Sequence, residues 1–167
     1  ISSVGKVKKA DITYLKKNFD LVLLGNTTEL PFKNFYETPN TLGMDRVALV
    51  SAAVQQYPKS NVLIIDAGTC ITYDFVSDKN EYLGGAISPG IRMRYQSLNN
   101  LTAKLPLLET EEPKNIIGNS TNNSIHSGVV YGVLKEIEGV IDAYRLNYKD
   151  LTVILTGGDT NFLSKQL

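Results

Sequence analysis

The sequence predicts an α/β protein, because apolar runs of strand length alternate with segments of helical periodicity. Three runs predict strands buried in a sheet, at 21–25, 62–65 and 151–155. The longest helical segment spans 121–144, where apolar residues recur at spacings of three and four. A chain of 167 residues is long enough for one large core or two small ones.

The N-terminal part of the chain predicts a helix followed by a strand. Residues 1–4 are expected to be the tail of a strand already inside a fold. An amphipathic helix is expected at 8–19, where Ile12, Leu15 and Phe19 share one face. The strand at 21–25 would complete an αβ unit.

Turn-forming residues over 26–39 predict a loop, which carries the aromatic residues Phe32, Phe35 and Tyr36. Aromatic side chains in a loop either fill a core or line a pocket, and the sequence leaves both possibilities open. A helix is expected to follow from residue 42 to residue 54.

Asp45 and Arg46 lie at the predicted start of this helix. The structural explanation is that the carboxylate stabilises the positive end of the helix dipole while the arginine is solvated. The functional explanation is that Asp45 faces a cleft and accepts a proton from a hydroxyl, while Arg46 holds an anionic or amide part of a substrate.

The stretch after the strand at 62–65 has the features of a phosphate-binding hairpin. Asp66 ends the strand and can hold a cation directly or through water. Gly68 allows main-chain N–H groups to approach an anion, and Thr69 adds a hydroxyl donor. The structural alternative is an acidic turn between two core strands.

The remainder of the chain predicts further layers of an α/β fold. A strand continues the hairpin to residue 75, and a second β-rich run covers 82–90. A helix at 90–103 and an acidic loop at 105–116 precede the long helix. After the strand at 151–155, a glycine turn leads into a last helix.

The composition argues against several classes of function. Seventeen Lys and Arg offset seventeen Asp and Glu, so no net field would attract nucleic acid or anionic lipid. No apolar run approaches the roughly 20 residues that a membrane span needs.

Cys70, the only cysteine, is expected to be a small buried residue and fits a reducing cytosol. His126, the only histidine, has no evident second ligand and is expected to be structural or exposed.

Taken in order, the motifs of the chain resemble those of type III pantothenate kinase. The resemblance covers nearly the whole chain and rests on Tyr36, Pro39, Leu42-Gly43-x-Asp45-Arg46, Asp66-Ala67-Gly68-Thr69, Gly84-Gly85-Ala86-Ile87-x-Pro89-Gly90, Thr102-Ala103-x-Leu105-Pro106, Gly118-x-x-Thr121, Ser127-Gly128 and Thr156-Gly157-Gly158. Each motif is common by itself, but the order and spacing of the set are specific.

The resemblance implies a ribonuclease H-like, actin-type kinase fold, in which ATP binds between two similar α/β domains. Residues 1–57 would be the remainder of the N-terminal subdomain, and residues 58–167 an incomplete C-terminal subdomain. The family's first phosphate loop, Asp-x-Gly-Asn-Thr, is not found here, because Gly25-Asn26-Thr27 lacks the leading aspartate. The family also continues beyond the equivalent of Leu167, so the first strands and the C-terminal end are expected to be missing.

The implied activity is the ATP-dependent phosphorylation of pantothenate to 4′-phosphopantothenate, the first step of coenzyme A biosynthesis. Family members resemble one another in needing Mg²⁺ and a monovalent cation, potassium or ammonium. They act as cytoplasmic homodimers, without nucleic acid or membrane partners.

The resemblance also implies a role for individual residues. Asp45 would be the catalytic base, and Asp66 would bind the monovalent cation. The substrate pocket would contain Tyr36, Gly43, Met44, Arg46, Ile87 and Thr121, and ATP would contact Gly68, Thr69, Gly157 and Gly158. Asp45 and Asp66 are expected to converge on a single crevice.

Two alternatives remain open at this point. A copy without the first phosphate loop could be a catalytically inactive, kinase-like regulatory or accessory protein. Another member of the superfamily, such as a sugar or acetate kinase, is the second alternative. The motif from Gly43 to Arg46, together with Tyr36, argues against it.

Overall fold

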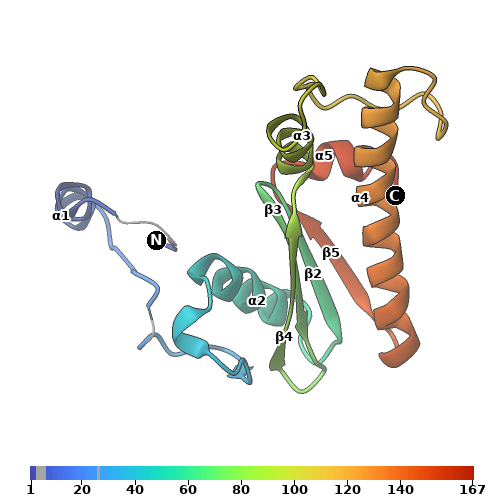
Figure 1. Cartoon of the computed structure of the whole chain (residues 1–167). Helices are drawn as coiled ribbons and strands as arrows, with labels where there is room; N and C mark the ends of the chain where they lie inside the picture. The colour runs from blue at the N-terminus through green and yellow to red at the C-terminus, as the bar shows by residue number, and fades with distance from the viewer. Residues whose placement is uncertain (3–6, 26) are drawn as a thin grey trace. The chain divides into compact units, whose positions relative to one another are not determined.

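The computed structural model describes residues 1–2, 7–25 and 27–167. The described strands form a five-stranded sheet in the order β1-β4-β3-β2-β5. Figure 1 shows the elements, which are α1 (Lys9–Asn18), β1 (Lys33–Asn34), the short 3-10 helix η1 (Pro39–Thr41), α2 (Met44–Gln56), β2 (Val62–Ala67), β3 (Cys70–Val76), β4 (Glu81–Pro89), α3 (Ile91–Asn100), α4 (Thr121–Asn147), β5 (Thr152–Thr156) and α5 (Thr160–Leu163). The predicted α/β class is confirmed.

Contacts between residues divide the chain into two compact units. Unit 1 consists of Ile1–Val62 and Asp74–Gly84, and unit 2 of Leu63–Tyr73 and Gly85–Leu167. The strands β2, β3 and β4 therefore contribute residues to both units. The actin-type arrangement and the boundary between residues 57 and 58 remain predictions.

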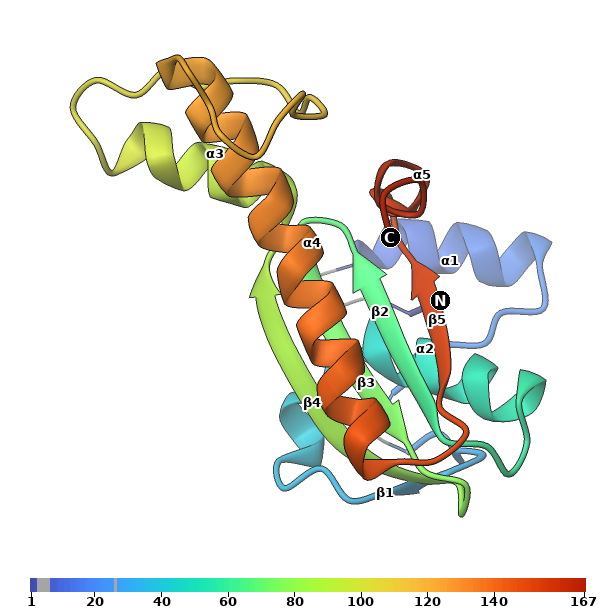
Figure 2. The same ribbon diagram turned by 90° about the vertical axis from the view of Figure 1, so that its right-hand side faces the viewer.

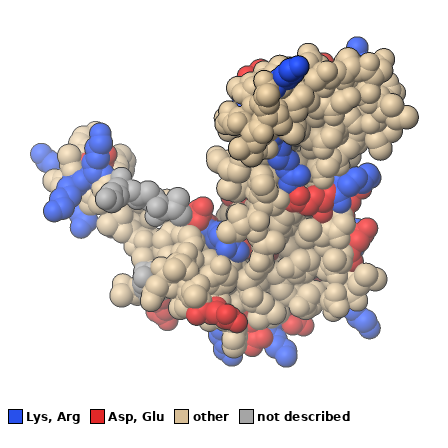
Figure 3. Space-filling view, in the orientation of Figure 1, with Lys and Arg blue, Asp and Glu red and all other residues tan. Residues whose placement is uncertain are grey.

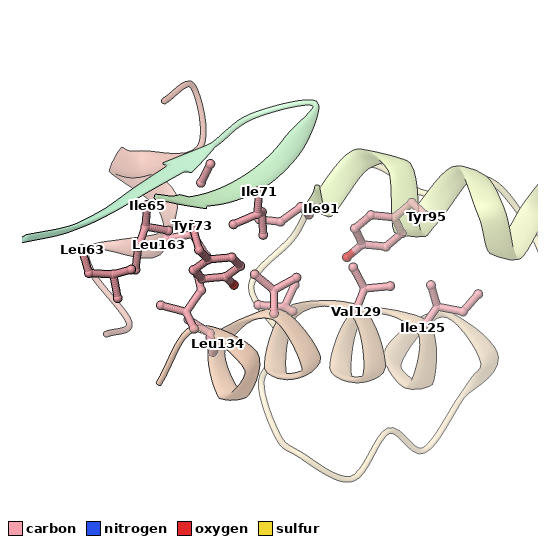
Figure 4. Packing of buried hydrophobic residues seen from close by; sticks show 14 residues of the cluster. Leu63, Ile65, Ile71, Tyr73, Ile91, Tyr95, Ile125, Val129, Leu134 and Leu163 are labelled. Carbon is pink, nitrogen blue, oxygen red and sulfur yellow. The ribbon is translucent and has the colours of Figure 1, made fainter. Parts of the chain in front are cut away.

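The core of unit 2 lies between α4 and the sheet. Ile125, Val129, Val133 and Ile137 recur every four residues on α4 and are buried. They pack with buried residues of β2 and β3, and Figures 2 and 4 show α4 lying along these strands. Because one stripe of the helix is apolar, burial of that stripe fixes the orientation of α4.

The predicted hairpin is confirmed at the end of β2. Residues 68–69 connect β2 to β3, and the Gly68 N–H donates to the Cys70 carbonyl at 2.9 Å. A second turn joins β3 to β4, with Asn80 at a φ of 57°. Asparagine tolerates this left-handed conformation better than most residues.

The predicted strand at 21–25 is wrong. The segment is irregular, and Val22 and Leu23 are 66% and 40% exposed. The Leu24 N–H donates to the Ile1 carbonyl at 3.0 Å, which is too short a ladder to form a strand. An apolar run forms a strand only where neighbouring strands supply hydrogen bonds. The predicted strand tail at 1–4 extends into residues outside the described part of the chain.

Two further elements differ from the prediction. The loop at 26–39 contains the short strand β1, which pairs in parallel with β4 through Lys33 and Glu81. Two paired residues are too few to produce a sequence pattern. β5 is half-buried rather than buried, because it lies at an edge of the sheet.

The helix α1 forms as predicted but buries none of its residues. Ile12 and Leu15 are half-buried, and Phe19 is exposed. Figure 3 shows Lys and Arg side chains gathered over α1, which ends with Lys16 and Lys17 in its last turn. These cations are favourable near the negative end of the helix dipole.

Candidate functional site

The ends of β2 and β5 meet in unit 2. Gly157 directly follows β5 and has a φ of 97°, a conformation that favours glycine. A Cβ atom at this position would lie 2.4 Å from Asp66 Oδ1 and 2.3 Å from the Ala67 carbonyl oxygen. The structure therefore brings together two residues for which the resemblance implies cation and nucleotide roles.

The end of β4 packs against the turn at residues 68–69. A Cβ on Gly90 would lie 2.0 Å from the Gly68 carbonyl oxygen and 2.5 Å from that of Thr69. The Gly90 N–H donates to the Thr69 carbonyl at 3.1 Å. Only glycine allows the backbone this close an approach.

The hydrogen-bond donors that the turn at residues 68–69 offers to an anion differ from those expected from the sequence. The Gly68 N–H already donates to Cys70, so in this conformation it is committed within the turn. Thr69 is exposed at the tip of the turn. Its hydroxyl is therefore the clearer donor to an anion at this position.

Asp159 lies beside the same strand ends. Its N–H donates to the Ala67 carbonyl at 2.9 Å, at the start of α5. Burial raises the pKa of the Asp159 carboxyl above its ordinary value. Gly158 is exposed, and nothing lies within 4 Å of the position that a Cβ would take.

Two oxygen atoms lie near Gly157 in unit 2. The carboxylate of Asp66 and the carbonyl of Ala67 are hard donors of the kind that bind alkali and alkaline-earth cations. Among the described residues, no group of three or more His, Cys, Asp or Glu side chains could hold a metal ion.

The other candidate residues lie at the start of α2 in unit 1. Gly43 precedes the helix, and Asp45 is exposed in its first turn. The Arg46 N–H donates to Asp45 Oδ1 at 2.9 Å, which orients the carboxylate at the positive end of the helix. Met44 lines a small cavity of about 170 Å³ in the same unit.

Arg46 points into the protein and is only 6% exposed. Its Nε donates to Asp74 Oδ1 at 2.8 Å, and its Nη2 lies 2.7 Å from the same oxygen. Burial alone would lower the pKa of Arg46, but the hydrogen bond and the charge of Asp74 outweigh it and raise the pKa. Arg46 is therefore charged throughout the physiological pH range.

Two tyrosines complete this arrangement. Tyr82 donates its hydroxyl to Asp74 Oδ1 at 2.7 Å, and its ring stacks on Tyr36 with centroids 6.1 Å apart. The Arg46 guanidinium carbon lies 5.6 Å from the centroid of the Tyr36 ring, within the range of cation–π attraction. We call Arg46, Asp74, Tyr82 and Tyr36 the Asp74 cluster.

The remaining predicted residues, Thr121 and Ile87, belong to unit 2. Thr121 is exposed at the start of α4 and lines a groove of about 670 Å³ together with Leu98 and Leu105. Ile87 is 64% exposed and is not among the residues that line this groove. Asp45, Arg46 and Tyr36 belong to unit 1, whereas Asp66, the turn and Gly157 belong to unit 2.

His126 and Cys70, the only histidine and the only cysteine of the sequence, have structural environments. The buried His126 makes a hydrogen bond through Nδ1 to the Tyr95 hydroxyl at 2.8 Å. Cys70 is half-buried rather than buried, because it directly follows the exposed tip of the turn.

Sequence reasoning missed Asp74 and Tyr82. A signal was present, because Asp74 is the only charged residue of β3 and charged residues are rarely buried without a partner. The identity of the partner depends on the tertiary fold, since Arg46 lies on a different element.

Comparison with known proteins identifies the family. The family model described as type III pantothenate kinase matches residues 1–143. The whole chain is 51% identical to the type III pantothenate kinase of Flavobacterium johnsoniae and 52% identical to that of Flavobacterium psychrophilum, covering 68% and 69% of those proteins.

A solved structure is also similar. It is a Campylobacter jejuni protein described as belonging to the Baf family of transcriptional activators, with a TM-score of 0.54 and 26% identity. The match covers 81% of this chain and 58% of that one.

None of the helices in the described residues combines the length and apolar character of a membrane span. By its family-model match and by its similarity to curated relatives over the whole of this sequence, the chain belongs to the type III pantothenate kinases, the enzymes that phosphorylate pantothenate in coenzyme A biosynthesis.

Proposed function

We propose that Asp45 is the base of this reaction and accepts the proton of the primary hydroxyl of pantothenate. The observation that carries the proposal is an exposed carboxylate, held by the first turn of α2, directly beside a buried arginine whose Nε donates to Asp74. A loose transition state asks mainly for orientation of the acceptor oxygen, so the base of this reaction need not be strong.

The Asp74 cluster supports a substrate pocket next to Asp45. Because Asp74 holds Arg46, the guanidinium keeps one position and presents its face to Tyr36. Tyr36 would then pack on pantothenate, with Gly43, Met44 and Arg46 around it. Thr121 and Ile87 would contact the same substrate, as the family resemblance implies.

The ATP phosphates are proposed to bind at the turn of residues 68–69 in unit 2. Thr69 would donate its hydroxyl to a phosphate, and Gly157 and Gly158 would lie near the nucleoside. The exposed position of Thr69 and the absence of side chains at both glycines support this assignment. Gly68 would contribute by permitting the turn.

The oxygen donors near Gly157 fit a hard cation. Asp66 would hold potassium or ammonium, and Mg²⁺ would bind largely through the ATP phosphates and water, as Mg²⁺ usually does with nucleotides. The two cations would supply positive charge to the phosphates. The family resemblance further supports a homodimer that works in the cytoplasm.

A coupled assay of ADP release tests the proposed activity. Pantothenate is expected to stimulate ADP release, whereas hexoses and acetate are not. Stimulation by a hexose or acetate instead would favour another kinase of the superfamily. ATP binding without turnover of any of these acceptors would favour the inactive regulatory protein.

Replacement of the proposed cation ligand gives a separate prediction. The Asp66→Asn variant is expected to need about tenfold or more potassium for half-maximal activity, because a neutral amide binds the cation more weakly than a carboxylate. Initial rates over a potassium titration measure this value. Asp142→Asn, an exposed change on α4, is the matched control. Equal potassium requirements in both variants would remove Asp66 from the cation site.

A further inference from the structure

We propose that Glu136 is a positioning residue that fixes the turn at residues 68–69 by holding the strands on both sides of it. The inference rests on the proposed function of this turn in binding ATP phosphates. Glu136 contacts neither the turn nor a substrate, and it acts through Tyr73 and Arg94.

The carboxylate of Glu136 makes two separate connections. It lies on α4 and is half-buried between the core residues of that helix. Its Oε1 accepts the hydroxyl of Tyr73 at 2.8 Å, and its Oε2 lies 2.5 Å from Arg94 Nη2. Each carboxylate oxygen therefore serves a different element of unit 2.

The connection through Tyr73 holds the strand that leaves the turn. β3 begins at Cys70, directly after the turn, and Tyr73 lies a short distance along it. The Tyr73 ring is buried, and Figure 4 shows it between β3 and α4. Its hydroxyl is the polar anchor of this part of β3.

The connection through Arg94 holds the strand that packs against the turn. Arg94 donates from Nε to the Pro89 carbonyl at 2.9 Å and from Nη2 to Ser88 Oγ at 2.9 Å. The next residue is Gly90, whose N–H donates to the Thr69 carbonyl and whose Cα has no room for a side chain. A shift of Arg94 would therefore be transmitted to the Thr69 backbone.

The electrostatics keep this arrangement charged. Burial disfavours the ionised form of Glu136, but hydrogen bonds from Arg94, Ser88 and Tyr73 outweigh it and lower the pKa of the carboxyl. Burial, followed by the bond to Glu136, raises the pKa of Tyr73, so its hydroxyl remains a donor. Glu136 is consequently ionised at neutral pH and accepts from both partners.

The experiment compares Glu136→Gln with Glu138→Gln. The first variant keeps the side-chain size but removes the charge that holds Arg94. The second removes the same charge two residues away, where Glu138 pairs only with Lys135 among the ion pairs of the described residues. We expect Glu136→Gln to raise the dissociation constant of ATP in calorimetry and the KM for ATP at least about fivefold. The KM for pantothenate should stay within about twofold of the unchanged protein.

Tyr73→Phe provides a second variant, because it removes only the hydroxyl. It should weaken ATP binding in the same direction, and combined with Glu136→Gln the two effects should not add. If Glu136→Gln fails to fold, Tyr73→Phe alone decides the question.

Direct titration with ATP distinguishes a failure of the proposed kinase function from a failure of the proposed role of Glu136. If the unchanged protein binds ATP but does not phosphorylate pantothenate, the proposed function fails while the role of Glu136 is still measured. The role of Glu136 is overturned if its variant binds ATP like Glu138→Gln. It is also overturned if the variant lowers the melting temperature without changing the affinity for ATP.

Discussion

Asp45→Asn is expected to reduce kcat by at least about tenfold and up to about 10⁴-fold, with the fold intact. The amide keeps the size of the carboxylate and its position in the first turn of α2, but it cannot accept the proton of the primary hydroxyl. Because this loss occurs in the transition state, kcat should fall more than the KM for pantothenate rises. Steady-state kinetics with pantothenate as the varied substrate measure both quantities.

Asp11→Asn is the matched control for this prediction. Asp11 is also an exposed acidic residue in the first turn of a helix, so its replacement removes the same favourable interaction with the helix dipole. Circular dichroism of both variants would establish that the folded state is retained. A turnover number close to normal in Asp45→Asn would remove Asp45 as the base.

Asp74→Asn is expected to lower the free energy of unfolding by about 3–5 kcal/mol. Asp74 is fully buried and Arg46 nearly so, and water therefore cannot compensate the charge that the substitution leaves on the arginine. The Tyr82 hydroxyl would lose its hydrogen-bond acceptor Oδ1 of Asp74 or bond to an amide in its place. Urea denaturation followed by circular dichroism measures the change.

Two further variants sharpen this measurement. Asp78 lies in the exposed turn after β3, so Asp78→Asn is the matched control. It should change the free energy of unfolding by less than about 0.5 kcal/mol. Arg46→Met added to Asp74→Asn should restore part of the lost stability, because the unpaired buried charge is then removed. A loss below about 1 kcal/mol in Asp74→Asn would show that the buried pair contributes little.

Regular elements could be predicted where a repeating pattern extends over many residues. α4 was predictable because its apolar residues recur at helical spacing, and β2 because a continuous apolar run ends in a turn. The segment 21–25 has a similar composition, but no strand in the described part of the chain pairs with it. The composition of a segment indicates its propensity to form a strand. Whether the strand forms depends on a neighbouring strand that hydrogen-bonds to it.

The candidate site was predictable only in part. Asp45, Asp66 and Thr69 belong to motifs with recognisable chemistry, so the sequence alone singles them out. The contact between Asp66 and Gly157 joins distant parts of the chain and was not predicted. Asp74 and Glu136 were missed, because the sequence does not reveal which distant side chains an acidic residue contacts in the fold.

The crowded backbone around Gly90 has a consequence for nucleotide recognition. Since Gly90 abuts the Gly68 and Thr69 carbonyls and the Gly68 N–H is bonded to Cys70, the loop has little freedom to reorganise. If a triphosphate binds here, as proposed, the turn at residues 68–69 would already have its bound conformation. Binding would then cost little conformational entropy of the backbone. Preorganisation of this kind favours tight binding by a small number of contacts.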